Sequence, residues 1–113
     1  MSSDVEKRSF PRRRFKWSVT LQTSQGVINT ETHNISVKGA YLRSWEPFEP
    51  GEIFKMFINV PTLNRPLLVD AEVVWTSADA VHHPVASRGM GVQFIKMSSL
   101  DRSLLNSKIF GSH

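Results

Sequence analysis

The feature that most constrains the fold is the alternation over residues 67–76, where every second position, from Leu67 to Trp75, is apolar. Such a period of two is typical of a strand with one face in a core. Weaker alternation or β-branched composition predicts further strands at 15–22, 27–35, 40–42, 52–60 and 89–97. The connections are too short for crossover helices, which argues against a parallel sheet. We therefore expect an all-β, mainly antiparallel barrel of about six strands, because closure removes exposed edges.

The last segment has a different period. Ser98 or Ser99 is a candidate N-cap, Asp101 falls in the first turn, and Gly111 is a stop signal. A short amphipathic α-helix is expected over residues 98–110, with its apolar positions at Leu100, Leu104 and Leu105.

Positive charge is concentrated near the start of the chain. Residues 7–16 contain six of the fourteen lysines and arginines and no acidic residue, whereas the remaining residues are mildly acidic overall. We expect one domain with three parts: a flexible basic N-terminal arm at 1–13, a β-barrel at 14–97 and the helix at 98–110. A basic arm is either a solvated tail or a site for an anion, such as nucleic acid, lipid headgroups or a free nucleotide.

The composition argues against several classes of protein. The 113 residues include no cysteine, so there is no disulfide framework, thiolate nucleophile or cysteine zinc site, and a reducing cytoplasm is expected. No apolar run approaches the ~18 residues of a membrane span, and the basic N-terminus is not followed by an apolar core, so neither export nor membrane insertion is expected. The serines lack a nucleophile elbow and the histidines lack metal-ligand spacing. We expect no catalysis, cofactor or metal site; the histidines are His33, His82, His83 and His113.

Two short motifs stand out. The first pairs Arg8 with Arg12 around Pro11, which disfavours a helix. Guanidinium groups form bidentate bonds with phosphates or guanine edges and stack on bases. The second places Asn34, Ser36 and Gly39 between two predicted strands, where Gly39 permits a positive φ or a close approach by a ligand. Taken by itself, the second motif is better explained as a β-turn with Asx-type side-chain bonding.

Together, Arg-x-x-x-Arg before the first strand and Asn-x-Ser-x-x-Gly about twenty residues later resemble the PilZ domain family. The resemblance covers residues 6–108. Within this range, the stretches 73–75 and 91–94 are also similar to the family and reinforce the match. It implies a bacterial six-stranded barrel that binds the second messenger cyclic di-GMP.

The resemblance also implies roles for individual residues. Arg8 and Arg12 grip guanine edges and phosphates, and Lys7, Arg13 and Arg14 add positive field and a further phosphate contact. The opposing wall consists of Asn34, Ser36 and Gly39. Trp75 either packs on the ligand, as a residue near this strand end does in some relatives, or is a core aromatic in register with Val73.

The expected function is thus a cyclic di-GMP receptor that signals to a separate protein partner by ligand-induced rearrangement. Two alternatives stay open. A small basic barrel can bind single-stranded nucleic acid, although Phe15 and Trp17 are expected to face inward, which leaves few aromatic side chains for an outer platform. The chain can also be a PilZ-like adaptor that no longer binds ligand. Ligand stoichiometry, oligomeric state and the role of Trp45 are not predicted.

Overall fold

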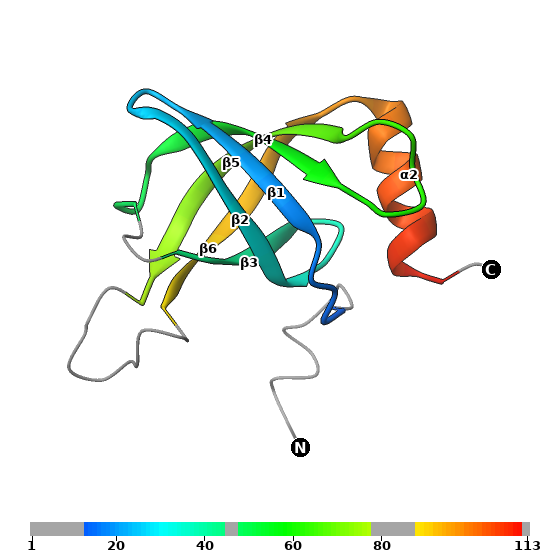
Figure 1. Cartoon of the computed structure of the whole chain (residues 1–113), viewed down its shortest axis with the longest axis horizontal. Coiled ribbons are helices and arrows are strands. Elements are labelled where there is room, and N and C mark those ends of the chain that lie inside the picture. The colour runs from blue at the N-terminus through cyan, green and yellow to red at the C-terminus, as the bar shows by residue number, and fades with distance from the viewer. Residues whose placement is uncertain (1–12, 45–47, 78–87, 112–113) are drawn as a thin grey trace, which may run out of the picture.

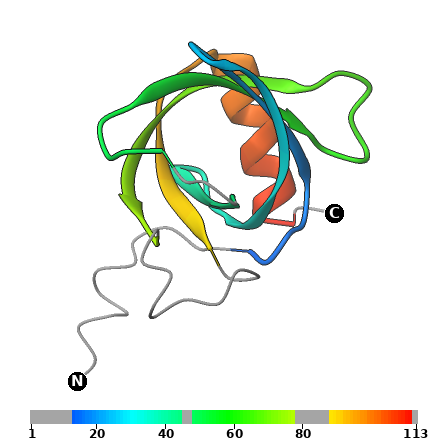
Figure 2. The same cartoon turned by 60° about the vertical axis from the view of Figure 1, so that its left-hand side comes forward.

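The computed structural model describes residues 13–44, 48–77 and 88–111, which form a barrel of six strands and one helix (Figure 1). The six strands are β1 Ser18–Thr23, β2 Gly26–Ile35, β3 Gly39–Arg43, β4 Ile53–Asn59, β5 Leu67–Thr76 and β6 Gly89–Met97. Each is antiparallel to its neighbours, and the sheet closes in the order β1-β2-β3-β6-β5-β4 (Figure 2). The predicted all-β closed barrel is confirmed.

The core consists of the inward positions of the alternating strands. In β5, Leu67, Val69 and Ala71 are almost fully buried, and Met56 and Ile58 oppose them from β4. Because every second side chain of a strand points to the same face, short strands supply enough apolar surface to fill a small barrel. Trp17, which was expected to face inward, is buried, as is Phe54, and Phe15 and Phe94 are half-buried against the core.

The helix α2, Ser99–Ile109, covers one end of the barrel (Figure 2). Ser98 is its N-cap, and Gly111 follows its end with a φ of 60°, a left-handed conformation that glycine adopts without strain. The buried positions are Asp101, Leu105 and Ile109, whose spacing of four aligns them on one face. Leu100, one of the apolar positions at helical spacing, is 62% exposed, because the core-facing stripe begins one residue later, at Asp101.

Asp101 ties α2 to the barrel. Its carboxylate accepts hydrogen bonds from Arg65 Nη2 at 2.6 Å and from the Leu68 amide at 3.0 Å. Its own amide donates to the Ser98 Oγ at 3.1 Å. The hydrogen bond from Arg65 is the main cause that lowers the Asp101 pKa, and burial opposes this shift. The first-turn acid predicted for α2 therefore also anchors the helix to the start of β5.

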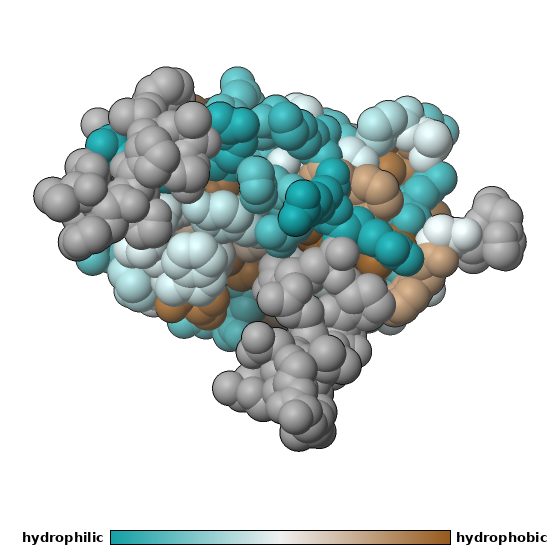
Figure 3. Space-filling view, turned by 90° about the horizontal axis from the view of Figure 1, so that it is seen from below, coloured by the Kyte–Doolittle hydropathy of each residue, from teal (hydrophilic) through white to brown (hydrophobic). Residues whose placement is uncertain are grey.

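Apolar side chains also remain on the outer surface. The more exposed ones are distributed over several strands and α2, and include Val27, Ile53, Leu68, Trp75 and Leu100. Figure 3 shows the face seen from below Figure 1, where hydrophobic areas are interrupted by hydrophilic ones. Exposed apolar surface alone therefore does not locate a site. Within the described ranges, no helix is long and apolar enough to cross a membrane.

Candidate functional site

A β-bulge in β5 determines the position of Trp75. Val73 pairs with Val92 of β6, but Trp75 pairs with the adjacent Gly91, so Val74 is an extra residue in β5. An extra residue reverses the inward and outward alternation that follows it. Val74 and Trp75 are consequently both outward, 45% and 49% exposed. Of the two interpretations of Trp75, the core aromatic is wrong.

A second bulge, in β2, places Asn34 outward as well. Thr32 pairs with Leu42, whereas Asn34 pairs with the preceding Tyr41. Thr32 is fully buried, and its Oγ1 accepts a hydrogen bond from the Trp17 amide at 2.9 Å. Without the bulge Asn34 would share the inward face of Thr32, two residues before it. The bulge turns Asn34 toward the outer face, where it is half-buried.

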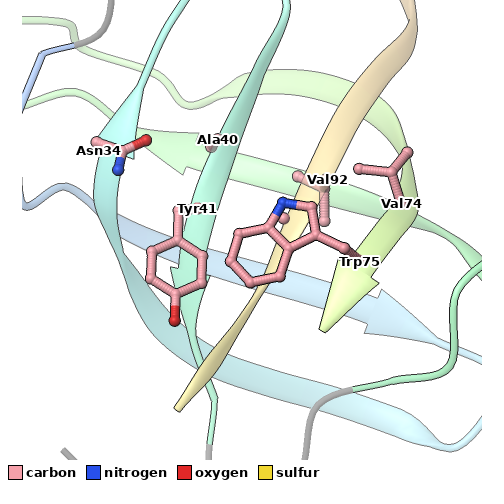
Figure 4. Close-up of a pocket in the computed structure, with 7 residues that line it drawn as sticks. Asn34, Ala40, Tyr41, Val74, Trp75 and Val92 are labelled. Carbon is pink, nitrogen blue, oxygen red and sulfur yellow. The ribbon is translucent and has the colours of Figure 1, made fainter. Parts of the chain in front are cut away.

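The two bulges bring four residues into one row on the outside of the barrel. Asn34 of β2 pairs with Tyr41 of β3, Tyr41 with Gly91 of β6, and Gly91 with Trp75 of β5. Across this row the rings of Tyr41 and Trp75 stack, with centroids 5.1 Å apart and planes 19° apart (Figure 4). The outer face therefore carries an aromatic pair that the sequence analysis did not expect.

Glycine at position 91 makes room for the indole. A Cβ added at Gly91 would lie 2.2 Å from the Trp75 Nε1, so any larger residue collides with the ring in this position. The Tyr41 ring lies over Gly89, two residues earlier in β6, in the same way. The neighbouring His33 meets Tyr41 edge to face at 5.6 Å between centroids.

A pocket of about 320 Å³ lies around this row. Its described lining residues are Asn34, Ala40, Tyr41, Val74, Trp75, Gly91 and Val92. The volume is at the lower end of small-molecule pockets, which span about 300–1,000 Å³. The lining combines aromatic and aliphatic surface with one amide and no formal charge, a combination suited to a flat heteroaromatic ring. Among the described residues, no group of three His, Asp or Glu side chains is placed to hold a metal ion.

Ser36 and Gly39 shape the corner beside the pocket. Ser36 is 2% exposed, and its Oγ accepts hydrogen bonds from the amides of Lys38 at 3.1 Å and Gly39 at 3.3 Å. A Cβ at Gly39 would lie 2.2 Å from the Val92 carbonyl oxygen of β6. Gly39 does not have a positive φ; the glycines that do are Gly26, Gly51 and Gly111. The expected close approach to Gly39 is observed, but it is made by β6. Both residues thus hold the turn that follows Asn34.

Arg13, the last residue of the basic segment (the N-terminal arm at 1–13), pairs with the barrel at this same corner. The Arg13 amide donates to the Ile35 carbonyl at 2.8 Å, and the Ile35 amide donates to the Arg13 carbonyl at 2.9 Å. The Arg13 Nε donates to the Ile109 carbonyl at the end of α2, at 2.9 Å. Arg13 therefore connects three parts of the chain: the basic segment, the residue after Asn34, and the helix.

Several predicted residues lie outside the described ranges. They are Lys7, Arg8, Arg12, Trp45, His82 and His83. The sequence analysis in turn missed His33, Tyr41, Val74 and Gly91. The spacing of glycines in β6, at positions 89 and 91, is the one signal in the sequence that could have revealed an outer face covered by large rings.

The structure is a small closed β-barrel with an outer pocket lined by two stacked aromatic rings. The PilZ domain family model matches residues 6–111, so the chain belongs to the PilZ domain family. No curated protein sequence matches the chain.

Solved structures of similar fold include three informative cases. The inhibitor of motility MotI/DgrA of Bacillus subtilis has 19% identity and a TM-score of 0.76, with 94% of this chain and 50% of that chain covered. The PilZ domain of Escherichia coli YcgR with c-di-GMP has 16% identity and a TM-score of 0.72, with 93% and 90% covered. The PilZ domain of CeSA from a cellulose-synthesizing bacterium has 13% identity and a TM-score of 0.60, with 91% and 99% covered. The chain spans about half the length of MotI/DgrA, and these identities support the fold alone.

Proposed function

We propose that this protein is a receptor for cyclic di-GMP that binds the dinucleotide on the outer face of β2, β3, β6 and β5. The observation that carries the proposal is the row of Asn34, Tyr41, Gly91 and Trp75, together with the pairing of Arg13 to Ile35 one residue beyond Asn34. Cyclic di-GMP is the ligand in the solved structure of the YcgR PilZ domain, which supports the choice of ligand.

The pocket supplies the contacts that a guanine ring needs. A half-exposed indole offers a π face on which a base stacks, and stacking of this kind is worth about 1–3 kcal/mol per base. Asn34, at the other end of the row, presents an amide that both donates and accepts hydrogen bonds. Ser36 and Gly39 act by holding the corner that carries Asn34.

The charge of the ligand is met by the basic segment. Cyclic di-GMP is a dianion, whereas the described lining of the pocket carries no formal charge. Arg8 and Arg12, with Lys7, supply the cationic groups. Arg13, the residue that follows Arg12, pairs with Ile35 at the corner of the site. Arginine suits this role because its planar group bonds phosphate or a guanine edge with two parallel hydrogen bonds. Micromolar affinity, about −8 kcal/mol, is expected.

Signalling follows from the double attachment of Arg13. Ligand that draws Arg8 and Arg12 toward the pocket also acts on Arg13, whose Nε bonds the last turn of α2. The rearranged surface is then the basic segment and the C-terminal end of α2, which a separate protein partner reads.

Isothermal titration calorimetry with cyclic di-GMP tests this proposal and also yields the stoichiometry. Arg12→Ala should weaken binding more than about tenfold, since a charge-assisted hydrogen bond is worth about 1.5–3 kcal/mol. Arg102→Ala, which removes an exposed arginine of α2 far along the chain from the motif, is the matched control and should bind like wild type. An Arg12→Ala protein that binds as tightly as wild type contradicts the assignment.

The aromatic pair also supports a second candidate ligand, single-stranded nucleic acid, because outward rings and a basic segment are the usual elements of such sites. Titration with a short oligonucleotide at two salt concentrations separates the two ligands. Tight, strongly salt-dependent oligonucleotide binding together with absent dinucleotide binding favours nucleic acid. Binding of neither ligand favours a protein-interaction adaptor.

A further inference from the structure

We propose that Tyr41 is the positioning residue of the site, which holds the Trp75 indole in the orientation that accepts a base. This inference rests on the proposed function. It adds a role for a residue that belongs to neither the Arg-x-x-x-Arg motif nor the Asn-x-Ser-x-x-Gly motif. Its basis is the way in which Tyr41 is fixed from several sides while Trp75 is not.

Tyr41 has partners around its whole ring. One face stacks on Trp75, and its edge-to-face partner is His33 of β2. Its hydroxyl lies 3.3 Å from the Ser77 Oγ, which in turn accepts a hydrogen bond from the Gly89 amide at 2.8 Å. A Cβ added at Gly89 would lie 2.8 Å from the Tyr41 ring, so the ring rests directly on β6. These contacts hold the Tyr41 ring from β2, β5, β6 and Ser77.

Trp75 has a less confined environment. It follows a bulge, is 49% exposed, and rests on Gly91 of β6 as Tyr41 rests on Gly89, but the contacts with His33 and Ser77 belong to Tyr41. Among the described residues, the aromatic contact that holds it in place is the stack with Tyr41, since its cross-strand partner is that glycine. A ring that is already held in its binding orientation loses less rotamer freedom when a ligand binds. Tyr41 therefore improves affinity through Trp75 rather than through its own contact with the ligand.

A double-mutant cycle tests this mechanism. Calorimetric titration with cyclic di-GMP compares wild type with Tyr41→Ala, Trp75→Ala and the double variant. Because the stack with Trp75 is lost, Tyr41→Ala should weaken binding about fivefold in the wild-type background. In the Trp75→Ala background the same substitution should have almost no effect, because the ring that it positions is gone.

Two further variants exclude a general loss of structure. Tyr41→Phe keeps the stack and loses only the hydroxyl contact with Ser77, so its affinity should stay within about twofold of wild type. Phe57→Ala removes another half-buried aromatic from the outer face of a strand, between Thr20 and Leu68, and should leave affinity unchanged. A ligand-free readout accompanies them: the indole ¹⁵N–¹H signal of Trp75 should move and sharpen in Tyr41→Ala but not in Tyr41→Phe.

The outcomes separate this inference from the proposed function. If wild type fails to bind cyclic di-GMP, the proposed function fails and this inference fails with it. If wild type binds but Tyr41→Ala weakens binding equally with and without Trp75, Tyr41 does not act through the indole and only this inference is overturned. An unchanged Trp75 indole signal in Tyr41→Ala also overturns it.

Discussion

Two glycines in neighbouring strands leave equally little room for an added Cβ, but their substitution by alanine should change the free energy of unfolding by different amounts. A Cβ at Gly39 would lie 2.2 Å from the Val92 carbonyl oxygen, and a Cβ at Gly91 would lie 2.2 Å from the Trp75 Nε1. Ordinary carbon contacts are about 3.5–4.0 Å, so the obstructing atom must move by more than about 1 Å in each case. At Gly39 this atom belongs to the β6 backbone, whereas at Gly91 it belongs to an exposed ring.

The expected costs follow from what has to move. Gly39→Ala has to separate β3 from β6, and overpacking of this kind costs about 1–3 kcal/mol before any weakened ladder bond is counted. Gly91→Ala displaces the indole and loses an aromatic pair worth about 0.5–1.5 kcal/mol. Alanine recovers about 0.4–1 kcal/mol by restricting the unfolded chain, so the net change at Gly91 should stay below about 1 kcal/mol.

Urea unfolding followed by far-ultraviolet circular dichroism measures both changes in the free energy of unfolding. Gly39→Ala should lower the midpoint strongly, and Gly91→Ala should leave it close to wild type while it weakens cyclic di-GMP binding. Equal destabilisation by the two variants would refute the reasoning, because it would mean that the Trp75 ring cannot swing away from β6. A stable Gly39→Ala protein would refute the close approach of β3 and β6.

Two further predictions concern α2. Asp101 has a lowered pKa, so the stability that its carboxylate contributes is complete above its ordinary pKa and is lost as pH falls through the folded value. Asp101→Asn should lower the free energy of unfolding by about 1.5–3 kcal/mol at neutral pH. Below about pH 4, the thermal stability of this variant should depend less on pH than that of wild type. Parallel pH profiles of the melting temperature would contradict this prediction. Arg13→Ala should speed up the hydrogen exchange of the Phe110 amide in the last turn, because the protection free energy falls by about 0.5–1 kcal/mol. Unchanged exchange would contradict a stabilising contact between Arg13 and the Ile109 carbonyl.

The sequence was sufficient to predict the barrel because the inward positions of β5 and β4 carry an uninterrupted alternation. Leu67, Val69 and Ala71 are buried as that pattern predicts, and the same rule placed Met56 and Ile58. Local signals also identified the Ser98 cap and Gly111 beyond the helix end. These features depend on periods and propensities within a few residues of chain.

The site was predictable only in part, because it depends on register between distant strands. The extra residue Val74 reverses the direction of Trp75, and the apolar run Val73-Val74-Trp75 does not by itself show that a residue is inserted there. The same holds for the bulge that turns Asn34 outward. The buried role of Asp101 depends on Arg65, thirty-six residues earlier, a separation at which sequence spacing carries no geometric information. Local pattern thus identified Asn34 and Trp75 as candidates, and tertiary pairing decided where they point.

The central claim is that cyclic di-GMP binds across the row of Asn34, Tyr41, Gly91 and Trp75. The most direct measurement is an NMR titration of uniformly ¹⁵N-labelled protein with the dinucleotide. We expect saturable shifts of the Asn34 side-chain amide, the Gly91 backbone amide and the Trp75 indole, whereas signals from the opposite face around Thr20 and Phe57 should stay unchanged. Absence of shifts at the row under saturating ligand, or shifts confined to the opposite face, would contradict the claim.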